Sequence, residues 1–308
     1  MTFIALYGDR NNRLGTHIMS YLNRVFYAYK HQFHLRYNEE TLSYSSSLFV
    51  TIILRFIEKY HLSISSFTSS REEPKEEPKE EPKSDEECNV FNEKLDFAQT
   101  MYKTLTTIGT DFRSYWREIY PEIHTDLWKL APAPYTENLP FDPKKTIAIH
   151  LRLDDVHDWW DYNGAFSAGY YRDMINRDAD MQEMYHIHNY GFCPNVQAPI
   201  PYDRIQPQIH AAKQRFPEHE IVIISSPSTR DLIPLPYRVI CNEDESYDLF
   251  LLSIADVVIL SRSHFSISAI LFGNHSHIYV PLWGQLVAYG FYTKYDRGND
   301  AGLFSFFW

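Results

Sequence analysis

Short, almost uninterrupted apolar runs are the feature of this sequence that most restricts its fold. Four of them, each three to six residues long, occur in the second half, at 146–151, 220–224, 238–240 and 257–260. They do not alternate apolar with polar residues, so each is expected to be a strand covered on both faces, as in a parallel sheet. A further strand is expected near the end, at 277–280, and helical segments are expected between the strands, at 206–216, 246–255 and 265–272. The predicted fold class is therefore α/β, with a Rossmann-like, mainly parallel sheet in the second half.

The first half begins with a similar pattern. Residues 3–7 are expected to form a short buried strand, residues 8–15 a polar turn, and the apolar positions from 18 to 29 recur at helical spacing. A Pro-rich stretch from 131 to 143 marks the expected boundary, which gives two domains, 1–140 and 141–308. Within the first domain, Glu-Glu-Pro-Lys occurs three times, and we expect a disordered, solvated insert near 70–88.

Charge and cysteine content limit the classes of protein that this chain can represent. Its 308 residues suffice for two cores, and a net charge of −11 argues against nucleic acid or an anionic membrane as the main partner. Three scattered cysteines give neither a disulfide framework nor a zinc-binding spacing. The N-terminus has too few apolar residues for a signal peptide, and no apolar stretch is long enough to span a membrane. We therefore expect a cytoplasmic protein.

Polar residues follow the predicted strands at the edge where open parallel sheets bind ligands. The first run ends in His150 and is followed by Arg152, Asp154 and Asp155. An arginine can bind a diphosphate bidentately and stabilise the charge of a departing phosphate, whereas His150 can contact a nucleotide. A simple ion pair between Arg152 and either carboxylate is the structural alternative.

Two hydroxyl-rich turns follow later strands. Ser225 and Ser226 can donate to phosphate or ribose, although helix capping is the more common role of such residues. Ser263 and His264 precede a predicted helix, whose free backbone N–H groups attract anions. Taken alone, this second turn is also only a good cap.

Together these segments resemble the GDP-fucose-dependent fucosyltransferase superfamily, which includes α1,2-, α1,6- and protein O-fucosyltransferases. Residues 12–17 are similar to the family's Gly-rich loop, with the first Gly and the Asn replaced. Its His-x-Arg-Arg-x-Asp motif corresponds to His150, Arg152 and Asp155, with Leu153 in place of the second Arg. Its last signature, an Asp-led apolar helix, Ala-Asp, a strand and a Ser-containing turn, matches the following residues: Asp248, Ala255, Asp256, Ser263 and Phe265.

The resemblance implies a GT-B-like fold of two Rossmann-type domains, an acceptor side in 1–140 and a nucleotide-sugar side in 141–308. It implies an inverting glycosyltransferase that uses a GDP-sugar such as GDP-fucose, a carbohydrate acceptor and no metal or other cofactor. Asp248 and His150 would read the base, and Arg152, Ser263 and His264 would hold the phosphates. The remaining donor contacts are expected from Asn12, Arg13, Gly15, Ser225, Ser226 and Phe265.

An inverting reaction needs a group that takes the proton of the acceptor hydroxyl. The candidates follow Arg152 closely in the sequence: Asp155, His157, Asp158 and Asp161, with the last two best spaced to reach an acceptor.

Two other readings remain open. Asp178-Ala179-Asp180 has the Asp-x-Asp form of metal-dependent glycosyltransferases, although alternate acids in a helix point to different faces. A non-catalytic sugar- or nucleotide-binding module is the second alternative, because Leu153 replaces an arginine and the acidic turn of the family is Ser225-Ser226 here.

Overall fold

The computed structural model describes residues 3–6, 13–31, 34–37, 42–59, 122–153, 200, 202–281 and 304–307. The chain divides into two compact units, 1–130 and 131–308, which are considered separately below. The predicted insert near 70–88 lies outside the described residues. So do several predicted site residues, namely Asn12, Asp155, His157, Asp158, Asp161, Asp178 and Asp180.

The first unit combines a small parallel sheet with amphipathic helices. Strand β1 (Phe3–Leu6) pairs in parallel with β2 (His34–Tyr37), and α1 (Leu14–His31) connects them. Helix α1 begins at Leu14, inside the predicted polar turn 8–15, and buries the side chains of Leu14, Ile18, Leu22 and Val25 at helical spacing. A second helix, α2 (Leu48–Lys59), also buries most of its apolar residues.

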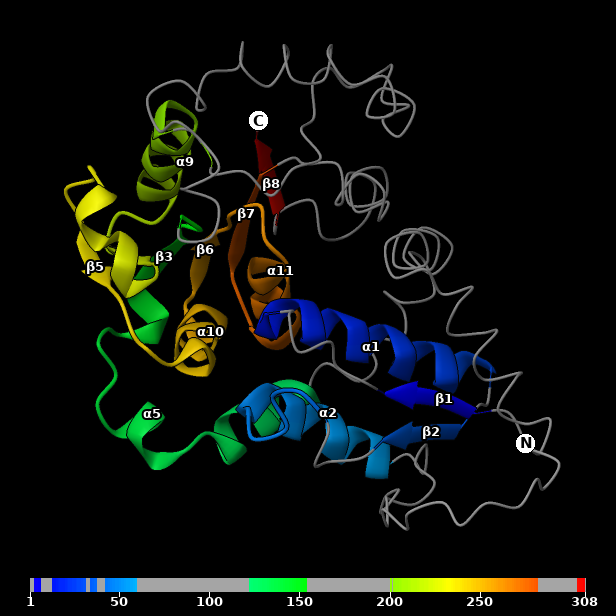
Figure 1. Cartoon of the computed structure of the whole chain (residues 1–308). Coiled ribbons are helices and arrows are strands. Elements are labelled where there is room, and N and C mark those ends of the chain that lie inside the picture. The colour runs from blue at the N-terminus through cyan, green and yellow to red at the C-terminus, as the bar shows by residue number, and fades with distance from the viewer. Residues whose placement is uncertain are drawn as a thin grey trace, which may run out of the picture. The chain divides into compact units, whose positions relative to one another are not determined.

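The second unit is a doubly wound α/β unit (Figure 1). Its strands are β3 (Thr146–His150), β4 (Glu220–Ile224), β5 (Arg238–Ile240), β6 (Val257–Ile259), β7 (His277–Pro281) and β8 (Phe304–Phe307). They pair in the order β5-β4-β3-β6-β7-β8, and every pairing is parallel. The predicted α/β class with parallel sheets is therefore confirmed.

Helix α5 (Ala133–Glu137) and the 3-10 turn Pro143–Lys145 precede β3. Between the strands lie α9 (Tyr202–Arg215), α10 (Glu245–Ile254), α11 (His264–Phe272) and the 3-10 turn Pro227–Leu232. No helix in the described part of the chain is long and apolar enough to cross a membrane.

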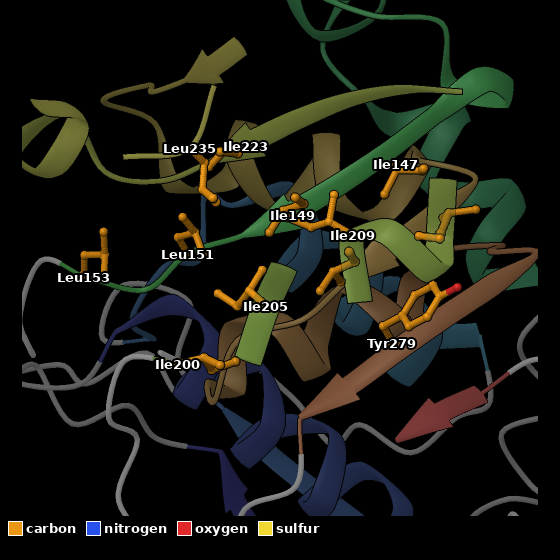
Figure 2. Packing of buried hydrophobic residues seen from close by; sticks show 13 residues of the cluster. Ile147, Ile149, Leu151, Leu153, Ile200, Ile205, Ile209, Ile223, Leu235 and Tyr279 are labelled. Carbon is orange, nitrogen blue, oxygen red and sulfur yellow. The ribbon is translucent and has the colours of Figure 1, made fainter. Parts of the chain in front are cut away.

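The central strand β3 has a different environment on each face. Ile147, Ile149 and the following Leu151 and Leu153 belong to one hydrophobic cluster, which also contains Ile205 and Ile209 of α9. Figure 2 shows the side chains of β3 and α9 meeting in this cluster. Because side chains alternate along an extended chain, His150 and Arg152 are placed on the opposite face. On this face, Ser266 of α11 contacts His150.

Gly273 ends α11 at a position with no room for a side chain. A Cβ atom there would lie 2.4 Å from the backbone oxygen of Ser253 and 2.2 Å from Nε2 of His275. The backbone oxygen cannot move without shifting α10, so Gly273→Ala is expected to lower the free energy of unfolding by about 1–3 kcal/mol. Urea denaturation measures this change.

The neighbouring Asn274→Ala is the matched control for Gly273→Ala, because Asn274 is exposed. We expect its unfolding midpoint to stay near that of the parent protein. Equal midpoints for both variants would contradict the tight packing at Gly273.

Candidate functional site

The strand order of the second unit identifies a ligand-binding edge. From β3 the chain proceeds to β4 and β5 on one side, then returns to place β6 on the other side of β3. The connections thus leave β3 and β6 in opposite directions. Open α/β sheets bind ligands beyond the carboxyl ends of the strands at such a switch point. The residues that follow β3 and β6 are therefore the central candidates.

His150 closes β3 at this switch point and is buried, with 8% of its surface exposed. Its Nδ1 lies 2.6 Å from Oγ of Ser266 and 2.8 Å from Oγ of Ser261. Its ring also packs against Phe265, with the ring centroids 5.1 Å apart and the ring planes tilted by 40°. Burial, assisted by the charge of Arg152, lowers the pKa of His150 from 6.5 to about 3. The imidazole is therefore neutral at physiological pH.

Arg152 follows the end of β3 by two residues and is half-buried. Its positive charge acts on His150, so the two predicted ligand groups share one neighbourhood. The segment just before Arg152 is fixed by Ser225, whose Oγ donates to the carbonyl of Leu151 at 2.8 Å. The backbone N–H of Leu151 donates in turn to the carbonyl of Ile224 at 3.0 Å. Position 152 is thus held by hydrogen bonds between the ends of β3 and β4.

The turn between β6 and α11 forms the other side of the switch point. Ser263 is the N-cap of α11, and its Oγ accepts a hydrogen bond from the N–H of Phe265 at 3.1 Å. His264, the first residue of the helix, is buried, and so is the guanidinium-bearing Arg262 just before it. The structure therefore brings together His150 and Phe265 by direct contact and Ser263 and His264 by adjacency. A helix N-terminus here favours a bound anion.

Ser225 and Ser226 follow β4, as predicted, and their hydroxyls bond within the protein. Besides its bond to Leu151, Ser225 lies 3.1 Å from the hydroxyl of Thr229. Ser226 precedes the 3-10 turn Pro227–Leu232 without capping it through its side chain, and contacts Thr229 and Ser228. The capping role expected for these serines is therefore wrong for Ser226.

Asp248 lies in the first turn of α10, next to the end of β5. Its Oδ1 accepts a hydrogen bond from Nδ2 of Asn242, which follows β5. Burial raises the pKa of Asp248 from 3.8 to about 7, with smaller contributions from the charges of Asp244 and Glu245, while the bond from Asn242 lowers it. This carboxyl group is thus part protonated at neutral pH.

The remaining residues predicted to contact the GDP-sugar belong to the first unit. The carbonyl of Arg13 accepts hydrogen bonds from the N–H groups of Thr16 and His17 at 3.0 and 3.1 Å. Gly15 is buried in the first turn of α1. Within the described residues, no group of three or more His, Cys, Asp or Glu side chains is placed to hold a metal ion.

Sequence reasoning did not identify Ser261 and Ser266 as part of the site. Both lie more than 100 positions from His150 in the chain, so only the fold brings them to its ring. The order of the strands would have been the useful signal, because β6 returns beside β3 and carries Ser261 to the switch point.

The site and sheet define a doubly wound α/β unit with its polar residues at the switch point. The sequence matches no known family model and no curated protein. Among solved structures, the chain is similar to POFUT1 in complex with GDP, in two crystal structures. The sequence identities to these two structures are 17% and 18%, and the TM-scores are 0.30 and 0.31. Each similarity covers 60% of this chain. The similar region spans 46% and 47% of the POFUT1 chains, so this chain matches less than half of their length.

Proposed function

We propose that this protein is a glycosyltransferase that transfers fucose, or a related sugar, from a GDP-sugar to a hydroxyl group of a glycan. The observation that supports this most is the meeting of His150, Phe265 and the N-terminus of α11 at the switch point, beside Arg152. A neutral hydrogen-bond donor (His150), an aromatic ring (Phe265), a cation (Arg152) and a helix N-terminus suit a nucleoside diphosphate, which offers a base, ribose hydroxyls and two phosphates.

Arg152 would bind the diphosphate and stabilise the negative charge that develops when the sugar departs. Ser263 and His264, at the first turn of α11, would complete the phosphate site.

The nucleoside would be read by His150 and Asp248, with Phe265 beside His150. A carboxyl group suits guanine, which presents two adjacent N–H donors on one edge. The polar turn at Ser225 and Ser226 is proposed to contact the GDP-sugar as well.

The proton of the acceptor hydroxyl would pass to one of the acids that follow Arg152 in the sequence, Asp155, Asp158 or Asp161. In an inverting reaction the oxygen of the acceptor attacks the anomeric carbon as the bond to GDP breaks. The carboxylate acts as the base and takes the proton, and GDP leaves with the bonding electrons. We propose that this reaction needs no metal.

A non-catalytic nucleotide- or sugar-binding module is a second candidate, supported by the position of Leu153. This leucine replaces the second arginine of the motif and is buried in the core cluster. A chain without that arginine can retain nucleotide binding and lose turnover. Hydrolysis of GDP-fucose without an acceptor, followed as GDP release, distinguishes the two: slow release supports the transferase.

Calorimetric titration of GDP, GDP-fucose, GDP-mannose and UDP-sugars, with and without Mn²⁺, tests the proposal. We expect binding of the guanine nucleotides that is selective over UDP-sugars and independent of the metal. A preference for UDP-sugars, or an absolute need for Mn²⁺, would contradict the proposed donor. Binding without any GDP release or transfer would favour the non-catalytic module.

A further inference from the structure

We infer that Ser261 and Ser266 are positioning residues that hold the imidazole of His150 with its hydrogen on Nε2, as a donor to an oxygen of a bound nucleoside diphosphate. The ligand in this inference rests on the proposed function. The tautomer of His150 does not, because it follows from contacts within the protein.

Three polar side chains form a closed cluster at the switch point. Oγ of Ser261 and Oγ of Ser266 both lie within hydrogen-bond distance of Nδ1 of His150, and they are 3.1 Å from each other. The backbone N–H of Ser261 also donates to Oγ of Ser266, at 3.1 Å. The two serines are 5% and 0% exposed, so water cannot readily replace these bonds.

The number of hydroxyl hydrogens in the cluster decides between the two tautomers. Each serine has one hydroxyl hydrogen, and among the described residues the hydroxyls of Ser261 and Ser266 bond only within this cluster. If Nδ1 of His150 is bare, one serine donates to it and the other serine donates to the first. Both hydrogens are then used.

The other tautomer leaves this cluster incomplete. If Nδ1 carries the hydrogen, it donates to one serine oxygen, and the two hydroxyl hydrogens have only each other's oxygens as acceptors. One serine can donate to the other, but the second hydroxyl hydrogen then has no acceptor in the cluster. Buried polar groups without a partner are unfavourable, so the bare Nδ1 is preferred and the hydrogen resides on Nε2.

This tautomer determines what His150 can do for a ligand. Both of its hydrogen bonds to described residues use Nδ1, so Nε2–H is the group left for a ligand. A neutral N–H donor pairs with a phosphate, ribose or carbonyl oxygen. Because Nε2 already carries a hydrogen, His150 cannot take the proton of an acceptor hydroxyl at that atom. His150 is therefore a binding residue, and the base must be another group. The contact with the tilted ring of Phe265 further restricts rotation of the imidazole.

The test is the tautomer of His150 by ¹⁵N NMR of the full chain labelled at histidine, with the signal assigned by its loss in His150→Gln. Long-range ¹H–¹⁵N correlations distinguish a bare from a protonated ring nitrogen. We expect a bare Nδ1 and a protonated Nε2 in the parent protein. In the double variant Ser261→Ala/Ser266→Ala we expect this pattern to be lost and the affinity for GDP to fall about tenfold, as when groups that orient a ligating histidine are removed.

Ser253→Ala is the matched control, because Ser253 is a fully buried serine whose Oγ donates to the carbonyl of Leu249 within α10. We expect it to leave the tautomer and the GDP affinity unchanged. A hydrogen on Nδ1 in the parent protein, or an unchanged Nε2–H signal and GDP affinity in the double variant, would overturn the inference. If GDP does not bind but the tautomer changes as expected, the positioning of His150 stands and the proposed function fails.

Discussion

Arg152→Ala is expected to reduce GDP affinity or turnover by a factor of about 10² or more, since it would remove the proposed charge-assisted contact to the diphosphate. The side chain is half-buried at the end of β3 and close enough to His150 to lower its pKa. Arg152→Lys keeps the charge but loses the planar, two-pronged donor, so an intermediate loss is expected. Calorimetry with GDP and the rate of GDP release from GDP-fucose measure the effect.

Arg204→Ala is the control for Arg152→Ala, because Arg204 is an exposed arginine on α9. It changes the net charge equally and should leave GDP binding unchanged. Circular dichroism must show both variants folded. Full activity of a folded Arg152→Ala protein would refute the role of Arg152 as the diphosphate ligand.

Asp248→Asn is expected to stabilise the protein at pH 8 by roughly 2–4 kcal/mol, at 1.36 kcal/mol per pKa unit. Burial raises the pKa of Asp248 from 3.8 to about 7. Between pH 3.8 and about 7, the folded state keeps a proton on Asp248 that the unfolded state releases. The stability that protonated Asp248 contributes is therefore lost as the pH rises through about 7. Asparagine carries no charge and can still accept the bond from Asn242.

Urea unfolding of Asp248→Asn and the parent protein at pH 4 and pH 8 tests this expectation. The difference should be small at pH 4 and large at pH 8. His150 acts in the opposite sense, since its pKa falls from 6.5 to about 3 and stability is lost as pH falls through that range. Because both proteins contain His150, its contribution cancels in the comparison. An equal difference at both pH values would refute the shifted pKa of Asp248.

Substitution of Asp248 is also expected to change stability and GDP binding in opposite directions. If this carboxyl group reads the guanine base, Asp248→Asn should bind GDP more weakly while being more stable at pH 8. Such opposite effects are common where a binding site keeps a group that folding alone disfavours.

The sheet of the second unit could be predicted from the sequence because its strands are local apolar runs. β3, β4, β5 and β6 lie within one residue of the predicted segments. Helix α9 instead begins four residues before its prediction, at Tyr202, because Pro207 lies inside the helix and resembles a start signal. Local patterns thus located these strands and misjudged the start of α9.

The arrangement of the site depended on long-range contacts that local patterns do not contain. Residues that follow a strand, such as His150 and Arg152, could be identified because their role depends on local position. Ser261 and Ser266 could not, because their bonds to His150 require β6 to pair beside β3. The strand β8 was also missed, since its four residues form an edge strand at the end of the chain.

Hydrogen–deuterium exchange of the whole protein, with and without GDP, tests most directly the claim that the nucleotide binds at the switch point between β3 and β6. We expect GDP to slow exchange in peptides covering 148–153 and 259–267, and UDP at the same concentration to have little effect. Unchanged exchange in both peptides at saturating GDP, or equal protection by UDP, would contradict a guanine nucleotide site there.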